Sequence, residues 1–485
     1  MNRSLQWYDY LTININFLGI SALSQTMTPL VLPLLVQNFV GEAQKGTYYG
    51  QLRLWSLMVA LLVQSLMGML SDHSTFRFGR RRPYILMGTL GVIIVIIMIG
   101  FAASLEGLHG YWTLFTLTIL MMLAVNTAHG AQQGLIPDLV PDNKRGAFSG
   151  VKAVLEVPIP VILVSLTIAK LVSSGKLWEG LFILCGTMMI TMLLTMLVPE
   201  QRFEKTNKNP DLKPFIQLLL MASVFTALIL SMGLLIRLTQ NIAEQLDGKY
   251  LLFVSGLGGL AAMSLSIILG VWFSIRVGIG KKAHDNKTFT WWVINRLSFL
   301  VGSTGMVSFM VYFLQGRFGF QGAEAAKPAA NLTMVVGLFI LLSAVPSGYL
   351  SDRFGCKPLI FISGALAAIG TMLLIIAPDM KLIFVGGSLI GIGTGFFYSV
   401  NWALGTQIVP KEEAGRFLGI SNLAGAGAGA IGAYIGGPIA DSITALTPQI
   451  PGLGYLVLFI IYGVLFIFSI LALHGVSLNK TLKPE

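Results

Sequence analysis

The stretch Gly-Met-Leu-Ser-Asp-His-Ser-Thr-Phe-Arg-Phe-Gly-Arg-Arg-Arg-Pro occupies residues 68–83, at the end of a long apolar run. A second stretch, Gly-Tyr-Leu-Ser-Asp-Arg-Phe-Gly-Cys-Lys-Pro, occupies residues 348–358 in the same setting. Both contain a glycine, an aspartate four residues later, a second glycine and a basic side chain. Two copies of one loop, about 280 residues apart, predict a chain built from two related halves.

The composition around these loops is that of a membrane protein. The mean hydropathy is +0.77, 55% of the residues are hydrophobic and 11% are charged. A soluble fold could not bury so much apolar surface. Apolar runs of about 20 residues, long enough to cross a hydrocarbon core of roughly 30 Å, recur throughout the chain. We therefore expect an all-α integral membrane protein.

Counting these runs predicts fourteen transmembrane helices. They cover approximately residues 11–38, 48–70, 83–103, 111–136, 147–170, 178–198, 214–236, 250–275, 288–314, 328–350, 358–377, 382–406, 416–440 and 453–475. With both termini cytoplasmic, 21 of the 32 Lys and Arg residues fall on the cytoplasmic side, 8 fall outside and 3 lie within spans. Because Lys and Arg concentrate in cytoplasmic loops, this orientation in the cell membrane is the predicted one. The net charge of +11 then reflects topology and attraction to anionic lipid, and it does not indicate nucleic acid.

A second motif repeats in the same order as the first. Residues 140–150, Val-Pro-Asp-Asn-Lys-Arg-Gly-Ala-Phe-Ser-Gly, match residues 409–419, Val-Pro-Lys-Glu-Glu-Ala-Gly-Arg-Phe-Leu-Gly, at an offset of 269. Residues 1–200 and 287–485 are therefore predicted to be two six-helix halves. Residues 201–286 are then a linker with two inserted transmembrane helices. The inserted pair is either a surface for a protein partner or only a tether.

The duplicated loop resembles that of major facilitator superfamily transporters, and Arg-Phe-Gly-Arg-Arg-Arg-Pro-Tyr at residues 77–84 resembles the sucrose and glycoside-pentoside-hexuronide symporter branch. The resemblance implies a secondary transporter. It also implies that the loop is a cytoplasmic gate, which favours the outward-open state and breaks when the inside opens. Topology is the alternative, since a basic cluster by itself holds a loop in the cytoplasm. The gate residues would be Gly68, Asp72, Arg77, Gly79, Arg80, Gly348, Asp352, Arg353, Gly355 and Lys357.

Ionisable side chains in the fourth and fifth spans are candidates for proton coupling. At 1.5 Å rise per residue, His129 and Glu156 come close to the bilayer midplane, and Lys152 lies one turn from Glu156 on the same helix face. Such groups cost roughly 2.5 to 3.5 kcal/mol each at the membrane centre, so they normally face a cavity and a partner. We predict that these three residues couple the proton, with Glu156 as its carrier. Alternatively, Lys152 and Glu156 form a neutralising pair and His129 is a satisfied polar residue between helices.

Substrate contacts are predicted in both halves. The offset of 269 relates His129 to Tyr398 and Gln133 to Trp402, so the titratable group has an aromatic counterpart. Aromatic rings and amides stack on and hydrogen-bond a sugar ring, although helix packing would explain the aromatic residues equally well. Trp291 and Trp292 fit an interfacial aromatic belt instead. Arg296 could bind a hydroxyl or carboxylate or pair with Glu156, and it could equally extend its side chain to the cytoplasmic face. The predicted substrate contacts are Asn126, Gln133, Arg296, Tyr398, Asn401 and Trp402.

The functional prediction is a proton-coupled symporter that moves a sugar or glycoside by alternating access. The paired aspartates of sodium-coupled melibiose-type transporters are missing from the second and fourth spans, so a proton is the simpler coupling ion. Two alternatives remain, a proton-driven exporter or antiporter of another small solute and a non-transporting membrane assembly protein. The sequence has no metalloprotease motif, phosphate-binding glycine loop or nucleophile elbow, so no enzyme activity, catalytic residue, metal or cofactor is expected.

Overall fold

The structure is a computed structural model that describes residues 6–76, 78–141, 144–198, 200, 213–243, 248–279, 287–409 and 414–477. Every regular element in these ranges is a helix. In this part of the chain, 13 helical segments are long and apolar enough to cross a membrane. A further helix of 33 residues, α18 (Ala414–Leu446), occupies the place of the remaining expected span. The all-α membrane fold is thereby confirmed.

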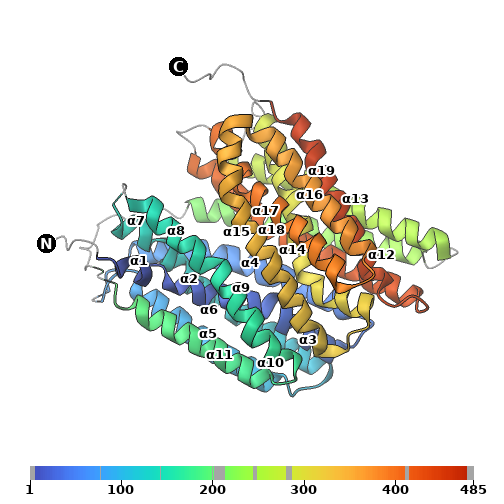
Figure 1. Ribbon diagram of the computed structural model, residues 1–485, viewed down its shortest axis with the longest axis horizontal. Helices are drawn as coiled ribbons and strands as arrows, with labels where there is room; N and C mark the ends of the chain where they lie inside the picture. Colours follow the sequence, from blue (N-terminus) through green and yellow to red (C-terminus); the bar gives the residue numbers. More distant parts are fainter. Residues whose placement is uncertain are drawn as a thin grey trace. The chain divides into compact units, whose positions relative to one another are not determined.

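The first packing unit contains Met1–Glu42, Trp55–Ile216 and Phe320–Met334. Figure 1 shows three of its helices, α5, α6 and α11, running side by side. Its helices are α1 (Asp9–Thr12), α2 (Ile15–Thr26), α3 (Leu32–Val40), most of α4 (Lys45–Asp72), α5 (Arg82–Ala102), α6 (Gly107–Gln133), α7 (Leu135–Leu139), α8 (Arg145–Glu156), α9 (Pro158–Leu163), α10 (Ala169–Ser173) and α11 (Leu177–Thr195).

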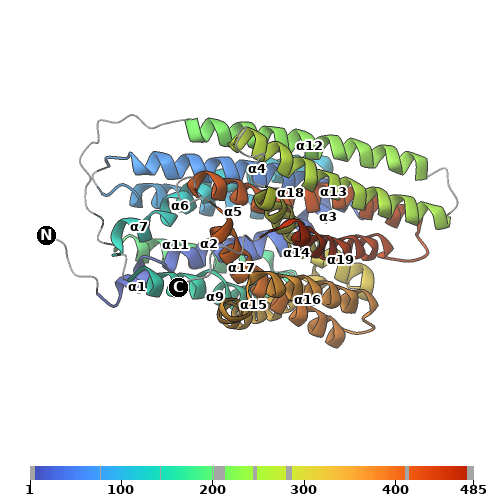
Figure 2. The ribbon, with the colours of Figure 1, turned by 90° about the horizontal axis from the view of Figure 1, so that it is seen from above.

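The second packing unit contains Ala43–Leu54, Gln217–Gly319 and Val335–Glu485. Figure 2 shows its helices α12 and α13 next to one another. Its helices are the start of α4, α12 (Lys213–Ala243), α13 (Gly248–Ile279), α14 (Lys287–Phe318), most of α15 (Ala326–Phe354), α16 (Cys356–Ile376), α17 (Met380–Ile408), α18 and α19 (Leu453–Ala472). The predicted boundaries between the two six-helix halves and the linker, at residues 200 and 286, come from the sequence repeat and stay predictions.

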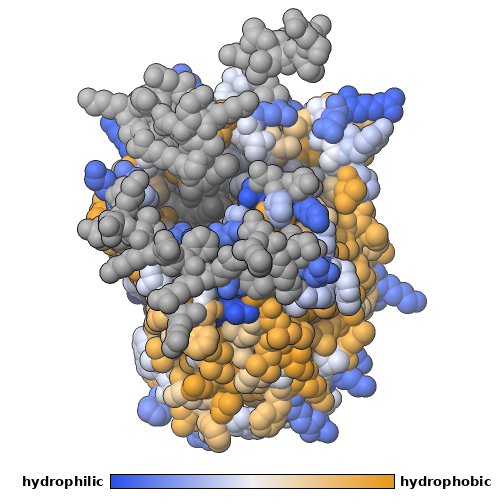
Figure 3. All heavy atoms as spheres, turned by 90° about the vertical axis from the view of Figure 1, so that its left-hand side faces the viewer, coloured by the Kyte–Doolittle hydropathy of each residue, from blue (hydrophilic) through white to orange (hydrophobic). Residues whose placement is uncertain are grey.

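Small residues let the helices approach closely. Gly88 of α5 faces α6, where an added Cβ would lie 2.6 Å from the Ala124 carbonyl oxygen and the Ala128 nitrogen. Such contacts between small residues are a main source of helix association in lipid, where burial of apolar side chains gives little driving force. On the face drawn in Figure 3, hydrophobic side chains form a broad surface with hydrophilic side chains at its borders. Large hydrophobic side chains such as Phe101, Leu166 and Phe182 are exposed, as expected for helices whose outer faces contact lipid.

Two spans are interrupted rather than straight. The first span passes through a π-helical turn, Met27–Val31, which contains Pro29. The fifth span breaks at Val157, between α8 and α9, and then passes through a second π-helical turn, Val164–Ile168. Proline lacks an N–H and its ring excludes the preceding helical turn, so Pro158 can begin a helix but cannot continue one. The Val157 N–H still donates to the Ala153 carbonyl at 3.2 Å, and the Val161 N–H donates to the Val157 carbonyl at 3.3 Å, so the interruption is local within one span.

The inserted pair packs within the second unit. Gln240 of α12 donates its side-chain amide to the Pro438 carbonyl of α18 at 2.9 Å. The ring of Phe225, also in α12, fills the space beside Gly270 of α13 and Gly427 of α18. The pair is therefore a packed part of this unit.

A buried carboxylate fixes the start of α4 in the second unit. Asp441 of α18 accepts hydrogen bonds from the backbone N–H groups of Gly46 and Thr47 at 3.0 and 2.7 Å. The Thr47 and Tyr455 hydroxyls donate to the same carboxylate at 2.8 and 3.2 Å. The first N–H groups of a helix have no partner within the helix, and the positive end of the helix dipole favours a negative charge. Asp441 thus caps α4 from another helix.

We expect Asp441→Ala to lower the free energy of unfolding by about 1 to 3 kcal/mol or more, because four buried donors lose their acceptor. Asp441→Asn retains one acceptor oxygen and should lose less. The measurement is reversible unfolding of the purified protein in detergent micelles. Glu106→Ala, at an exposed carboxylate, is the matched control and should leave the stability unchanged. Wild-type stability of Asp441→Ala would show that the carboxylate does not hold α4.

Candidate functional site

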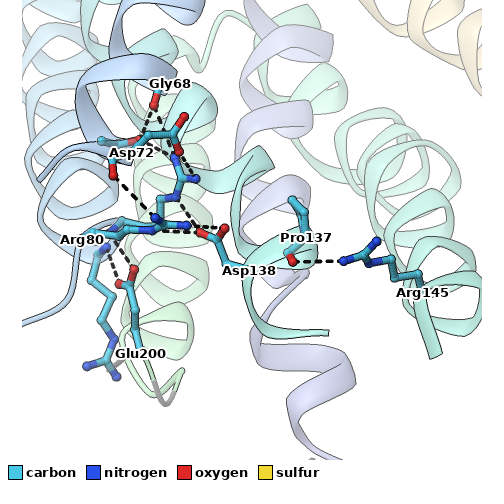
Figure 4. Close-up of polar contacts among 10 residues, drawn as sticks. Gly68, Asp72, Arg80, Pro137, Asp138, Arg145 and Glu200 are labelled. Atoms are coloured by element: carbon cyan, nitrogen blue, oxygen red, sulfur yellow. Dashed lines mark hydrogen bonds and ion pairs between the residues drawn. The ribbon is translucent and has the colours of Figure 1, made fainter. Parts of the chain in front are cut away.

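A network of ion pairs surrounds the first glycine-aspartate loop (Figure 4). Asp72, the last residue of α4, pairs with the guanidinium of Arg81. The Arg81 Nε lies 2.9 Å from Oδ2 of Asp138 in α7, and Arg80 pairs with the same carboxylate. The Arg81 side chain is 5% exposed, whereas that of Asp72 is 49% exposed. One buried guanidinium therefore joins two carboxylates, and the pair with Asp138 is the better shielded from water.

Arg81 is also bound by neutral groups. Its Nη1 donates to the Ser71 hydroxyl at 2.6 Å and to the Gly68 carbonyl at 3.4 Å. A Cβ at Gly134, between α6 and α7, would overlap the guanidinium. Gly134 thus leaves the space through which Arg81 reaches Asp138.

Glu200 completes the network at the start of α5. Its carboxylate accepts hydrogen bonds from the backbone N–H groups of Arg81 and Arg82 at 2.8 and 3.1 Å. A carboxylate at a helix N-terminus meets unpaired donors and the positive end of the dipole. Gly79, with φ of 107°, leaves room for this carboxylate, since an added Cβ would overlap it. Glu200 therefore ties the segment after α11 to the start of α5.

The structure brings together four of the predicted gate residues of the first copy, Gly68, Asp72, Gly79 and Arg80, whereas Arg77 lies outside the described residues. Sequence reasoning missed Arg81, Asp138 and Glu200. The available signal was an acidic residue at the end of the fourth span and another after the sixth. Figure 4 also shows Arg145, which donates to the carbonyls of Val140 and Pro137 at 3.2 Å each and so closes the turn between α7 and α8.

The second loop copy repeats the backbone of the first but not its charges. The Ser351 hydroxyl donates to the Gly348 carbonyl at 2.7 Å, as Ser71 does to Gly68 at 2.8 Å. Gly355 has φ of 84° before α16, as Gly79 has before α5. Among the described residues, Asp352 has no ion-pair partner. The guanidinium of Arg353 lies 5.4 Å from the ring of its neighbour Phe354. Lys357 is half-buried at the start of α16.

The predicted proton-coupling residues lie around one ring in the first unit. The Lys152 Nζ is 3.6 Å from Oε2 of Glu156 and 4.5 Å from the ring of Phe17. His129 meets the same ring edge to face, with ring centroids 6.0 Å apart. Phe17, a buried residue of α2, thus contacts both His129 and Lys152. Nothing in the sequence distinguished it from other apolar residues.

Glu156 is the last residue of α8, directly before the helix break. It lies near the middle of the span Arg145–Ser173, and its side chain is 36% exposed. Its partner Lys152 is 28% exposed. Both charged groups are thus inside the span and are only partly covered by other protein atoms. Among the described residues, no group of three or more His, Cys, Asp and Glu side chains could hold a metal ion.

The predicted substrate amides of the first unit differ in their bonding. The Nδ2 of Asn126 donates to the Met122 carbonyl of its own helix at 2.8 Å, and the residue is buried. Gln133 is exposed, with its Nε2 3.2 Å from the His129 Nε2. Gln133 therefore remains accessible, whereas one donor of Asn126 is already used.

The second unit contains a polar cluster between α14, α17 and α19. The Nη1 of Arg296 donates to Oδ1 of Asn401 at 3.1 Å. The Nδ2 of Asn401 donates to Oδ1 of Asn295 at 2.8 Å, and Asn295 donates to the Ser469 hydroxyl and carbonyl at 2.8 Å. Trp292 donates its indole N–H to the Asn401 carbonyl at 3.1 Å. Asn401 is thus fully buried and held from three sides.

Two aromatic rings lie on the accessible side of this cluster. The ring of Trp402 has its centroid 5.5 Å from the guanidinium carbon of Arg296. Tyr398 lies within electrostatic range of the same guanidinium. These two residues are 40% and 43% exposed. The expectation that Trp292 belongs to an interfacial belt is wrong, because its ring is fully buried and hydrogen-bonded; its neighbour Trp291 is 39% exposed.

Comparison with known proteins identifies the relationship. The family model of the Major Facilitator Superfamily matches residues 17–318 and 294–484. The sucrose transport protein SUC3 of Arabidopsis thaliana is 33% identical over 110 residues, which cover 19% of this chain and 18% of SUC3. The efflux pump DEP3 of Alternaria brassicicola is 29% identical over 121 residues, 24% of this chain and 22% of DEP3. The aligned part is thus about a fifth of each relative.

A solved structure shares the fold over nearly the whole chain. The nucleoside transporter NupG superposes with a TM-score of 0.60 at 12% sequence identity, covering 96% of this chain and 99% of NupG. At that identity the likeness shows the fold alone.

We expect the buried pair of Arg81 and Asp138 to show a coupling energy of about 1 to 3 kcal/mol in a double-mutant cycle of Arg81→Ala and Asp138→Ala. Removing one partner leaves the other buried and unpaired, which is the costly situation. The measurement is the free energy of unfolding in detergent micelles. The control cycle uses Lys176 and Glu179, an exposed pair at 3.4 Å, which should couple by no more than about 0.5 kcal/mol. Equal coupling in the two cycles would contradict the structural role of Arg81.

Proposed function

The chain belongs to the major facilitator superfamily, and from that premise we propose that it is a proton-coupled symporter that moves a sugar or glycoside by alternating access. In this proposal it lies in the cell membrane with both termini cytoplasmic, as the distribution of Lys and Arg favours. The observation that carries the proposal is the Lys152–Glu156 pair at the break of the fifth span.

Glu156 is the proposed proton carrier. Its carboxylate lies 3.6 Å from the Lys152 ammonium inside a membrane span, and its side chain is 36% exposed. A proton on Glu156 removes the negative charge of the pair, and the ammonium then keeps its contact with the Phe17 ring at 4.5 Å. Protonation thereby removes the salt bridge and leaves the cation–π contact. Because Pro158 and Pro160 follow Glu156 and have no N–H to donate, the loss of the salt bridge acts where helical hydrogen bonds are missing.

His129 is proposed to assist from the other helix. Its ring meets Phe17 edge to face, and its Nε2 lies 3.2 Å from the amide of Gln133. A change in the protonation of His129 alters both contacts, since the neutral ring can accept a hydrogen bond from the amide and the charged ring cannot. Substrate bound at Gln133 would therefore be linked to the protonation of His129.

The proposed substrate contacts in the second unit are Arg296, Tyr398 and Trp402. Exposed rings next to a hydrogen-bond donor suit the apolar face and the hydroxyls of a sugar. Asn401 was predicted as a direct contact as well. Because its side chain is fully buried and both its oxygen and nitrogen are used, we propose that it positions Arg296 instead. In the first unit, Gln133 is the more accessible amide and Asn126 contributes its remaining acceptor.

The loop network around Arg81 is proposed to form the cytoplasmic gate. Its charges belong to one loop and the ends of α4, α5 and α7, so they hold these ends together while the gate is intact. The remaining predicted gate residues, Gly348, Asp352, Arg353, Gly355 and Lys357, form the corresponding loop with the same serine-to-glycine hydrogen bond.

The partial match to sucrose transport protein SUC3 supports a sugar, and the match to efflux pump DEP3 supports export as a second candidate. For the inserted helices α12 and α13 we propose two alternative roles, a surface for a protein partner or a tether between the halves. Both helices have exposed apolar side chains, such as Leu234, Leu238 and Phe253.

We expect Glu156→Gln to reduce sugar-driven proton uptake at least a hundredfold, because the amide cannot carry a proton. The measurement uses purified protein in proteoliposomes, with a pH-sensitive dye inside and a panel of mono- and disaccharides outside. The control is Glu179→Gln, at an exposed carboxylate outside the proposed site, which should transport like the wild type.

Three outcomes discriminate between the candidates. Proton uptake that survives Glu156→Gln would exclude Glu156 as the carrier. Solute leaving the vesicles against an inward proton flux would favour the exporter. Absence of flux with every solute would favour a non-transporting assembly protein.

A further inference from the structure

The helices α4 and α15 each begin in one packing unit and continue into the other. The residues of α4 before Trp55 belong to the second unit, and the remaining residues belong to the first. The residues of α15 before Val335 belong to the first unit, and the remaining residues belong to the second. The two helices lead into the two copies of the glycine-aspartate loop, so they have equivalent places in the repeat. The exchange of their starts is therefore reciprocal.

The two helix starts are bound by different chemistry. In the start of α15, Oδ1 of Asn331 accepts a hydrogen bond from the Ser165 hydroxyl at 2.8 Å. In the start of α4, the backbone N–H groups of Gly46 and Thr47 and the Thr47 hydroxyl donate to the carboxylate of Asp441. Hydroxyl and amide groups do not change charge near neutral pH, whereas a carboxyl group does when its pKa lies in that range. The acceptor at the start of α4 is thus the titratable one.

Glycines bring the backbones of α4 and α18 into contact beside this carboxylate. A Cβ at Gly46 would lie 2.8 Å from the Gly437 carbonyl oxygen, and a Cβ at Gly50 would lie 2.3 Å from the Ala433 carbonyl oxygen. Small residues allow such a close approach of two helices. Because no side chains interlock at these glycines, the attachment of the α4 start depends on polar contacts such as those of Asp441.

The other groups around the carboxylate come from α4, α14 and α19. The Lys45 Nζ donates to Oε1 of Gln315 at 2.8 Å and lies 4.6 Å from the Tyr312 ring. It also lies 5.6 Å from the ring of Tyr455, whose hydroxyl donates to Asp441 at 3.2 Å. The buried titratable and charged side chains on these helices near their contact with α18 are Lys45, Tyr49, Arg53, Tyr312 and Tyr455.

The charged and titratable groups of α12 and α13 are further from the carboxylate or exposed. Arg237 of α12 lies within electrostatic range of Tyr434, which precedes Asp441 by about two turns of α18. Tyr250 of α13 is exposed. The negative charge of Asp441 therefore acts mainly on the start of α4, where it meets the unpaired N–H groups and the positive end of the helix dipole.

We propose that Asp441 is a proton-controlled latch for the start of α4. The ionised carboxylate accepts hydrogen bonds from four donors and holds the helix start in the second unit. A proton taken up from water gives a neutral carboxyl group, whose hydrogen bonds are weaker, and the start of α4 is then released. Return of that proton to water restores the attachment. The attachment is thus present at higher pH and lost as the pH falls.

In the proposed orientation, α4 begins on the extracellular side, so extracellular acid releases it. The start of α15 has no such response, because its contact with Ser165 does not titrate. The inference goes beyond the proposed function, since neither a transported solute nor a proton on Glu156 takes part in it.

The test is hydrogen–deuterium exchange of the purified full-length protein in detergent micelles, which reports the opening of individual backbone N–H groups. Between about pH 8 and pH 4, a range in which carboxyl groups of proteins titrate, the protection of residues 45–54 should fall about tenfold or more. The comparison is made after correction for the intrinsic pH dependence of exchange. Residues 326–334, at the start of α15, and the interior of α14 should keep their protection.

Asp441→Asn imitates the protonated carboxyl group, because it removes the charge and keeps one acceptor oxygen. It should lower the protection of residues 45–54 at both ends of the pH range and abolish the pH dependence. The matched control is Asp379→Asn. Asp379 also accepts a hydrogen bond from a helix N-terminus, that of the Leu382 N–H at 3.0 Å, but it is exposed. Its replacement should leave the exchange of the α4 start unchanged.

Protection of the α4 start that does not change with pH would overturn the inference, as would a pH dependence that persists in Asp441→Asn. Simultaneous loss of protection in α14 would indicate general unfolding and would also reject the latch. If Asp441→Asn does not fold, the comparison of the α4 and α15 starts in the wild type decides the question. The measurement needs no solute, so a failure of the proposed symport leaves its result unaffected.

Discussion

A charge in the hydrocarbon core must be compensated within reach of its own side chain, because no water is available to solvate it. Three cationic side chains among the described residues are compensated in three ways, and Arg81 lies between two spans rather than inside one. Arg81 is enclosed by carboxylates, Lys152 shares its charge with Glu156 one turn away, and Arg296 has only dipoles and an aromatic ring. The first arrangement contains its own counter-charges, the second contains a carboxylate that can take up a proton, and the third consists of neutral hydrogen-bonding groups and a ring. The proposals for the gate, the proton carrier and the substrate contacts are based on these three differences in charge compensation.

The same constraint explains where the helices break. A break exposes backbone carbonyls and N–H groups, which lipid does not tolerate unless a cavity or neighbouring groups satisfy them. The fifth span is interrupted beside Glu156 and Lys152, whose charged side chains pair with each other and are partly exposed. The first backbone N–H groups of α4 also lack partners within their helix. The carboxylate of Asp441 accepts hydrogen bonds from two of them. Irregular backbone and polar side chains thus occur together.

The two sequence repeats share a framework and differ in chemistry. The loops after Gly68 and Gly348 have the same serine-to-glycine hydrogen bond and a glycine of positive φ before the next helix. Backbone geometry is therefore kept where the chain must turn. The side chains above this framework have diverged, with titratable groups around Phe17 in one unit and a neutral amide cluster around Asn401 in the other. In the proposed function, this division assigns proton coupling to one repeat and additional solute contacts to the other.

The sequence by itself determined the membrane fold, the approximate spans and the family, because hydropathy over about 20 residues and two repeated loops are local properties of the chain. It also singled out Glu156, Lys152 and Arg296, since a charge in an apolar run is visible without a structure. The tertiary structure decided the partners. These contacts depend on how neighbouring helices are rotated and at what depth they meet. Examples are the contacts of Phe17 with His129 and Lys152, those of Asp138 and Glu200 at the start of α5, and that of Trp292 with Asn401. Those rotations are set by close packing over many small contacts, which no single stretch of sequence encodes.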